Sequence, residues 1–166
     1  GGYLATAFAA FPFSAMARRV WDRYYRPGGK RANEAYLRLP MQAWDNPPEL
    51  QELCILANFA EVWLARQGHS HPVGVNYLEK IQIPHLPSLY GSMLAGVAYV
   101  LMGAGVPLKV PGILDRFVNH QAATYPLHVK GAEPGDDFAL RFDPGDFGEG
   151  DPAPLVRPRF LAIVSS

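Results

Sequence analysis

The sequence predicts an α/β fold with parallel strands, and three apolar runs lead to that prediction. The runs "VGVNYL", "YVLMG" and "FLAIV" are rich in β-branched and other apolar residues, which is typical of strands buried in a sheet. A helical pattern that ends in a glycine separates the first run from the second. A strand, a helix and a strand in this order join neighbouring parallel strands by a crossover. We therefore expect a parallel sheet with helices packed against it.

Residues 1–70 predict a helical part with an irregular segment inside it. Ser14 can cap a short helix over residues 15–25, and the glycines of "RPGGK" can end it. Residues 26–44 show no clear period, so we expect a long irregular excursion there. Whether the insertion over residues 26–46 is a lid, a dimer contact or a packing insert stays open.

A second helix is expected directly after this insertion. Asn46 can cap it, while Pro47 and Glu49 suit its first turn. Apolar residues then recur at helical spacing, and Gly68 can end the helix. The residues at this spacing are Leu50, Leu53, Cys54, Ala57, Ala60 and Leu64.

Residues 71–120 hold the core of the predicted fold. The expected elements are a strand over 73–78, a helix over 87–95, a strand over 99–103 and a helix over 112–119. Gly96 can take the left-handed conformation that ends the first of these helices, and Pro111 suits the start of the second.

Residues 121–159 predict a short antiparallel excursion before the sheet resumes. Runs over 123–129 and 138–142 flank the turn "GAEPGDD", which is typical of two antiparallel strands. The acidic, Gly- and Pro-rich tract "DPGDFGEGDPAP" then predicts an exposed loop. Residues 160–166 begin with the third apolar run, so we expect them to form the next parallel strand.

Composition excludes several classes of function. The 166 residues carry 15 basic and 15 acidic side chains, which gives no support for a nucleic-acid partner. The single Cys54 excludes an internal disulfide and a multi-cysteine metal site, so we expect no metal. No run approaches the roughly 18 apolar residues that span a membrane, and no signal peptide pattern opens the chain. We therefore expect no membrane partner and a cytoplasmic location.

The ends of the chain suggest an interior piece of a longer protein. The sequence starts at Gly1 without a methionine and stops on an apolar run that nothing follows to cover.

The three predicted strands end in small or polar residues, which are the candidate binding residues. Asn76, the run Gly103–Gly105 and Ser165 would meet at one edge, and ligands of parallel α/β folds gather at the carboxyl ends of strands. An amide can donate and accept toward a heteroaromatic ring, and glycines allow a close approach to the backbone. The pattern alone favours the alternative of ordinary strand-end turns with an amide cap.

Other candidates are weaker. His69 and His71 lie two residues apart without a third ligand nearby, so a polar loop is the preferred interpretation. "MGAGVP" lacks the spacing of a dinucleotide or P-loop motif. Lys80 could meet an anion or stay solvated. Met102 on an apolar strand fits packing better than a flavin contact when judged by pattern alone.

The stretch "HPVGVNYLEKIQIPHLPSLYGSMLAGVAYVLMGAG", within residues 56–117, resembles the nitronate monooxygenase family, formerly called 2-nitropropane dioxygenases. "RPRFLAIVSS" resembles the next barrel strand of that family. The resemblance implies a (β/α)8 TIM barrel that binds FMN and oxidises alkyl nitronates with molecular oxygen. An eight-stranded barrel needs about 250 residues, so the chain would be a partial barrel over residues 1–166 with an insertion and an antiparallel excursion.

The resemblance also implies roles for particular residues. Asn76, Met102, Gly103, Ala104 and Ser165 match positions close to the flavin. As substrate contacts we name Tyr77 and Lys80, which follow that asparagine on the same strand and its loop.

The family's remaining site residues are expected outside this chain. Neither its "GGH" segment with the catalytic histidine nor its glycine-rich phosphate site is present, so the catalytic residue is unknown. The chain alone is therefore expected to be inactive and to bind FMN poorly. An FMN-dependent enoyl reductase on the same barrel and a non-catalytic fragment stay open as alternatives, and so does a homo-oligomer.

Overall fold

The chain is described by a computed structural model that covers residues 2–148, 150 and 152–164. In chain order these residues form α1 (Gly2–Ala9), α2 (Ser14–Tyr24), α3 (Pro48–Ala65), β1 (Gly74–Leu78), α4 (His85–Leu94), β2 (Tyr99–Gly103), α5 (Val110–Val118), β3 (Ala123–Pro126), β4 (Ala139–Phe142), the short 3-10 helix η1 (Pro144–Asp146) and β5 (Arg159–Ala162). No helix in this part of the chain is both long enough and apolar enough to span a membrane.

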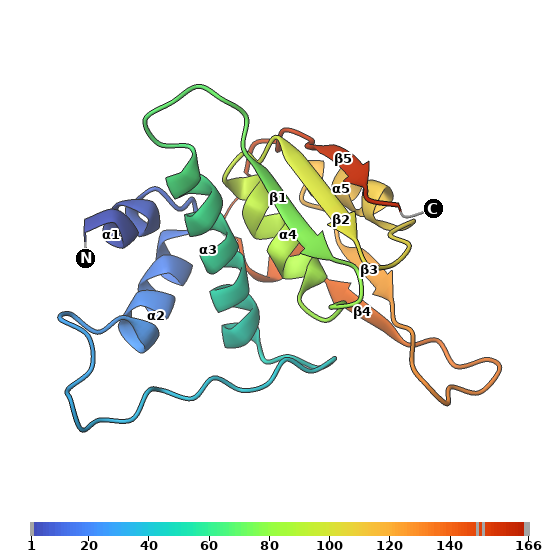
Figure 1. The fold of residues 1–166 in the computed structure, drawn as a ribbon, viewed down its shortest axis with the longest axis horizontal. Helices are drawn as coiled ribbons and strands as arrows, with labels where there is room; N and C mark the ends of the chain where they lie inside the picture. Colours follow the sequence, from blue (N-terminus) through green and yellow to red (C-terminus); the bar gives the residue numbers. More distant parts are fainter. Residues whose placement is uncertain (1, 149, 151, 165–166) are drawn as a thin grey trace.

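The centre of the fold is a parallel sheet with the strand order β1-β2-β5. Gly74 pairs with Tyr99 where β1 and β2 begin, and Leu78 pairs with Gly103 where they end. α4 connects β1 to β2, while α5 and the β3–β4 hairpin lie between β2 and β5 in the chain. Figure 1 shows α4 and α5 behind the strands. The predicted strand–helix–strand unit is confirmed.

The two faces of this sheet differ in burial, because side chains alternate along a strand. Val100 and Met102 are fully buried in the core that α4 and α5 share with the sheet. Leu78, Leu161 and Ile163 lie on the opposite face and are 44%, 47% and 48% exposed. No helix among the described elements covers this opposite face, which we call the open face.

The described residues do not close a barrel. β1 and β5 each pair with one strand, so the sheet has two edges in this part of the chain. The mixed α/β class, with one small parallel and one small antiparallel sheet, is confirmed. The finer prediction of a TIM barrel is not confirmed, since barrel closure requires all eight strands.

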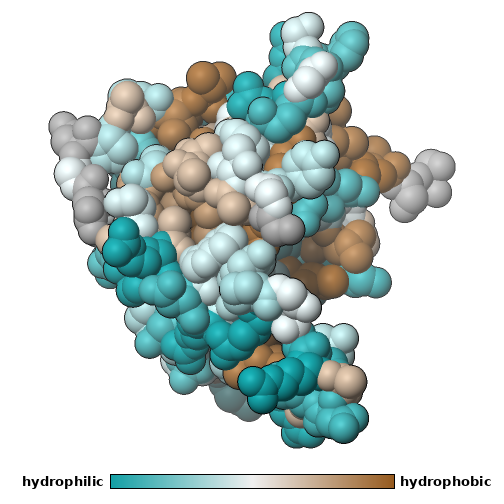
Figure 2. All heavy atoms as spheres, turned by 90° about the vertical axis from the view of Figure 1, so that its left-hand side faces the viewer, coloured by the Kyte–Doolittle hydropathy of each residue, from teal (hydrophilic) through white to brown (hydrophobic). Residues whose placement is uncertain are grey.

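The helices α1, α2 and α3 form a second part of the core beside the sheet (Figure 1). α3 lies against α4 so closely that a Cβ atom on Gly91 would come within 2.1 Å of the Ile55 carbonyl oxygen. On its other side, α3 is joined to α2 by three hydrogen bonds that the Arg19 guanidinium donates to the Glu52 carboxylate, the shortest at 2.6 Å. Figure 2, turned by 90° from Figure 1 so that the side of α1 and α2 faces the viewer, shows hydrophobic patches between hydrophilic surface. α1, with Tyr3 84% exposed, was not predicted.

The predicted side-chain caps at the starts of α2 and α3 are wrong. Phe13 and Pro47 are the N-cap residues of α2 and α3, and neither helix has a side-chain cap at its start. Ser14 lies inside α2 instead. Asn46 folds back on the preceding loop, where its Oδ1 accepts a hydrogen bond from the Ala43 N–H at 2.7 Å.

The insertion between α2 and α3 is irregular, as predicted. Figure 1 shows it as a long loop that runs below both helices. Tyr36 and Trp44 are 79% and 65% exposed, so these large aromatic rings contribute little to the core.

The antiparallel excursion is confirmed, while the predicted exposed loop after it is partly wrong. β3 and β4 pair antiparallel, with Tyr125 opposite Leu140. Pro144 and Phe147 of the acidic tract are buried, and the Phe147 ring stacks on Phe142 with 5.2 Å between ring centroids. An aromatic ring has enough apolar area to anchor an otherwise polar loop to the core.

Candidate functional site

The carboxyl ends of the parallel strands meet at one edge of the sheet. Leu78 ends β1 opposite Gly103 of β2, and Met102 lies opposite Ala162 at the end of β5. The Glu79 N–H donates to the Gly103 carbonyl at 2.8 Å, so the loop after β1 stays attached to the end of β2. This edge, which we call the carboxyl edge, therefore collects the residues that follow each strand.

Asn76 lies on the open face, two residues before the carboxyl edge. Its side chain is exposed, and it pairs in register with Leu101 of β2. No group in the described part of the chain hydrogen-bonds the Asn76 amide. The amide is thus available to a ligand on the open face, with both a donor and an acceptor.

Met102 and Tyr77 lie on the other side of the sheet. The Met102 side chain is fully buried beneath the helices, so only its backbone lies near the open face. The Tyr77 hydroxyl donates to Asn58 Oδ1 at 2.8 Å and lies 2.5 Å from the Ser92 hydroxyl. Burial raises the pKa of Tyr77. In this arrangement Tyr77 joins β1 to α3 and α4, and its hydroxyl does not share a face with Asn76.

Gly103 and Ala104 form the turn at the end of β2. A Cβ on Gly103 would come within 3.0 Å of the Ile163 side chain, so the space beside this glycine is filled by the residue after β5. Ala104 is exposed and has a φ of 58°, which is uncommon for a residue with a side chain. Strained turns of this kind persist where neighbouring contacts hold them, and they cluster at functional sites.

Two predicted contact residues remain, Lys80 and Ser165. Lys80 is exposed beside the carboxyl edge, and no carboxylate among the described residues pairs with it. Ser165 lies outside the described residues.

A buried carboxylate, Glu79, was missed by the sequence analysis. Its side chain is 7% exposed, and its Oε1 accepts hydrogen bonds from Tyr125 Oη at 2.8 Å and Gln82 Nε2 at 3.0 Å. A Cβ on Gly105 would come within 1.8 Å of Glu79 Oε2, so the carboxylate lies directly against the turn after β2. The feature of the sequence that could have revealed it is an acidic residue immediately after a predicted strand. Tyr125 lies 46 residues further along the chain, and no local pattern connects the two.

The surroundings of Glu79 keep it charged. Burial alone raises the pKa of Glu79. The hydrogen bonds from Gln82 and Tyr125, with smaller electrostatic contributions from His85 and His128, lower it more, so the pKa lies below its ordinary value. Burial and the adjacent carboxylate raise the pKa of Tyr125, which keeps its hydroxyl protonated as a donor.

His85 lies beneath this cluster. It is 2% exposed, and its ring packs edge-on against Tyr125 with 5.1 Å between centroids. Its Nε2 lies 3.0 Å from the Leu78 carbonyl, which can only accept, so Nε2 carries the proton. Nδ1 is buried without a partner in the described residues. Burial lowers the pKa of His85 more than the Leu78 hydrogen bond and the Glu79 charge raise it.

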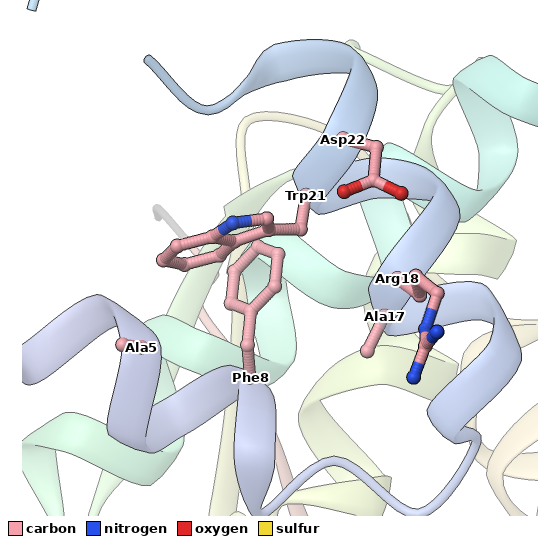
Figure 3. A pocket seen from close by; sticks show the side chains of 6 residues that line it. All are labelled: Ala5, Phe8, Ala17, Arg18, Trp21 and Asp22. Atoms are coloured by element: carbon pink, nitrogen blue, oxygen red, sulfur yellow. The ribbon is translucent and has the colours of Figure 1, made fainter. Parts of the chain in front are cut away.

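A surface pocket between α1 and α2 is a second candidate. It has a volume of about 390 Å³ and is lined by Ala5, Phe8, Ala17, Arg18, Trp21 and Asp22. Figure 3 shows the Phe8 ring meeting Trp21 edge-on, with Arg18 and Asp22 on α2. α1 and α2, which form the pocket, lie on the far side of α3 from the sheet (Figure 1). The charged side chains of its lining are one basic residue, Arg18, and one acidic residue, Asp22. We favour the carboxyl edge, because it combines a buried charge, a strained turn and unbound polar groups.

The described residues hold no group of three or more His, Cys, Asp or Glu side chains placed to bind a metal.

No protein-family model, curated protein or solved structure matches the chain. The family named from the sequence therefore stays a prediction.

The carboxyl edge can bind a flat polar molecule by hydrogen bonds from several directions. Asn76 offers an amide, Lys80 an ammonium group, and Glu79 an acceptor oxygen. The N–H groups of Ala104 and Gly105 have no acceptor among the described residues. Such a set of donors and acceptors at the ends of parallel strands is the usual composition of a cofactor or substrate site.

Proposed function

We propose that this chain is part of an FMN-dependent oxidoreductase of the nitronate monooxygenase type, which oxidises alkyl nitronates with molecular oxygen. In this proposal the three parallel strands are an arc of a (β/α)8 barrel, and the open face is the barrel interior. The protein's partners are then a small organic substrate and O2.

One observation carries the proposal: consecutive parallel strands with their crossover helices on one face only. The order β1-β2-β5 follows the chain, and α4 and α5 both lie behind the sheet (Figure 1). A doubly wound sheet has helices on both faces, whereas a (β/α)8 barrel has all of them outside. The open face, with Leu78, Leu161 and Ile163 exposed, fits the interior layers of a barrel that further strands would complete.

The residues at the carboxyl edge fit one side of a flavin ring. Asn76 and the N–H groups of Ala104 and Gly105 would hydrogen-bond the ring, and the exposed Lys80 would attract an anionic nitronate. Bound FMN would supply the electron transfer, while the protein would position the substrate and exclude water. Met102 would contribute only its backbone to the flavin site, since its side chain is buried under the helices.

The test uses the protein encoded by the longest open reading frame that contains this chain. We expect the purified protein to carry FMN, and we expect propyl-2-nitronate to trigger oxygen consumption in an oxygen-electrode assay without an added reductant. Reduction of the flavin by NADPH in the absence of oxygen, without any turnover of the nitronate, would favour the enoyl reductase instead. A protein that carries no flavin would overturn the proposal.

The 166-residue chain is expected to bind FMN weakly on its own. It supplies only a three-stranded part of the proposed barrel, and open strand edges invite association. Titration of FMN into the purified chain, followed by flavin fluorescence, checks this expectation. Stoichiometric binding at micromolar concentration would contradict it.

A further inference from the structure

The carboxylate of Glu79 is held in a fixed orientation at the carboxyl edge. Tyr125 from β3 and Gln82 from the loop before α4 both donate to the same oxygen, Oε1, at 2.8 and 3.0 Å. Two donors on one oxygen leave the group little freedom to rotate. The side chain is 7% exposed, so water competes weakly with these hydrogen bonds.

The second oxygen of Glu79 has no donor in the described part of the chain. Oε2 lies against Gly105, where a Cβ would approach it to 1.8 Å. No side chain or backbone N–H among the described residues binds Oε2, and it is not among their buried atoms without a partner. A carboxylate with one oxygen fixed and the other open is a prepared hydrogen-bond acceptor.

Unbound donors lie beside this acceptor. Ala104 and Gly105 are exposed, and their N–H groups meet no acceptor in the described residues. The left-handed φ of 58° at Ala104 turns the backbone where β2 ends. The corner between β1 and β2 therefore presents a carboxylate acceptor next to backbone donors.

We propose that this corner recognises an imide edge, in which a ring N–H lies between two carbonyl groups, with Glu79 accepting from the N–H and the Ala104–Gly105 turn donating to a carbonyl. The oxidised isoalloxazine ring has one such edge, so the inference rests on the proposed function for the identity of the ligand. Glu79 is then a ligand-binding residue, and Tyr125 and Gln82 are positioning residues that act through it. The fixed negative charge also keeps anionic groups away from this corner.

A metal ion is a poorer occupant of the same corner. No group of three or more metal-ligating side chains occurs in the described residues. Exposed backbone donors such as those of Ala104 and Gly105 repel a cation and attract a carbonyl oxygen.

The experiment compares two small probes on the 166-residue chain: uracil, which has an imide edge, and 1,3-dimethyluracil, which lacks the N–H groups. Binding is followed through the side-chain carboxyl ¹³C resonance of Glu79, assigned with Glu79→Gln. We expect uracil to bind in the millimolar range that suits so small a ligand and to shift this resonance. We expect dimethyluracil to bind about 10- to 100-fold more weakly, because a charge-assisted hydrogen bond is lost.

Variants separate recognition from folding. Tyr125→Phe keeps the carboxylate but removes one of its two donors, so the preference for uracil should fall several-fold while binding persists. Glu61→Gln removes an exposed carboxylate on α3 and should change nothing. The probe comparison needs no variant, so it decides the question even if Glu79→Gln does not fold. Equal affinity for the two probes, or no shift of the Glu79 resonance with uracil, overturns the inference.

A second comparison distinguishes this inference from the proposed function. The protein from the longest reading frame is titrated with FMN and with its N3-methyl derivative. Tight binding of both flavins alike overturns the recognition by Glu79 while the flavoprotein proposal stands. A preference for uracil in a protein that binds no flavin supports the imide site and overturns the proposed function.

Discussion

Replacement of Gly91 by alanine tests how the helices of the fold pack, and its effect follows from one distance. A Cβ on Gly91 would lie 2.1 Å from the Ile55 carbonyl oxygen and 2.9 Å from its carbon, whereas ordinary contacts begin near 3.4 Å. Both partners are helix backbone, so no side chain can swing away. α3 and α4 would have to separate by about 1.3 Å, in a core that is otherwise close-packed.

The expected loss of stability is the difference between two terms. Overpacking of a core costs about 1–3 kcal/mol, and a clash with backbone belongs at the upper end. Alanine in place of glycine stabilises a helix by about 1 kcal/mol. We therefore expect Gly91→Ala to lower the free energy of unfolding by about 2 kcal/mol or more. With a urea m-value of about 2 kcal/mol/M, the unfolding midpoint would fall by about 1 M.

Urea unfolding followed by far-UV circular dichroism measures this change. Gly112→Ala is the matched control, because Gly112 lies in α5 and a Cβ there meets nothing within 4 Å. The control should be unchanged or up to about 1 kcal/mol more stable. A Gly91→Ala protein within about 0.5 kcal/mol of the original, which is the usual range for surface changes, would refute the reasoning.

Three further predictions concern stability and the site. Burial lowers the pKa of His85, so in acid the unfolded chain binds a proton at this residue that the folded chain does not. The free energy of unfolding should therefore fall by up to about 1.4 kcal/mol per pH unit as the pH drops below ~6.5. Urea unfolding of His85→Gln should show a flatter pH dependence than that of the original chain. Tyr77→Phe leaves Asn58 Oδ1 without its 2.8 Å donor and should lower the free energy of unfolding by about 1–3 kcal/mol in the same assay. In the protein from the longest reading frame, Lys80→Gln should raise the KM for propyl-2-nitronate several-fold, with FMN affinity unchanged.

Each of these has an outcome that contradicts it. An unchanged pH profile for His85→Gln would mean that the histidine is not buried neutral. If Tyr77→Phe had the free energy of unfolding of the original chain, the hydroxyl network between β1, α3 and α4 would not contribute to stability. A KM that does not respond to Lys80→Gln would remove this lysine from the substrate site.

Local patterns accounted for most of the sheet and its helices. The apolar runs around Val75, Val100 and Phe160 predicted β1, β2 and β5 because a strand buried on at least one face needs such residues. Gly96, with a φ of 72°, ends α4 as its position after a helical pattern indicated. The parallel pairing followed from the helix between the first two strands.

What the sequence did not reveal depends on contacts between distant residues. Tyr125 meets Glu79 across 46 residues, and no periodicity joins a phenol in one hairpin to an acid after another strand. Phe147 is buried, although its neighbours in the sequence predicted an exposed loop, because its ring stacks on that of Phe142. Asn76 was predicted as a polar residue near the end of an apolar strand, and the structure places it within β1, on the open face of the sheet.

The FMN content of the protein from the longest reading frame, compared with that of its Asn76→Ala variant, tests the central claim most directly. We expect about one FMN per chain, and an affinity at least about 10-fold weaker in Asn76→Ala, since in the proposed site the amide would contact the ring directly. Asn33→Ala, an exposed change in the insertion, should bind FMN like the original. A protein that purifies and stays without flavin, or an Asn76→Ala variant with unchanged affinity, would contradict it.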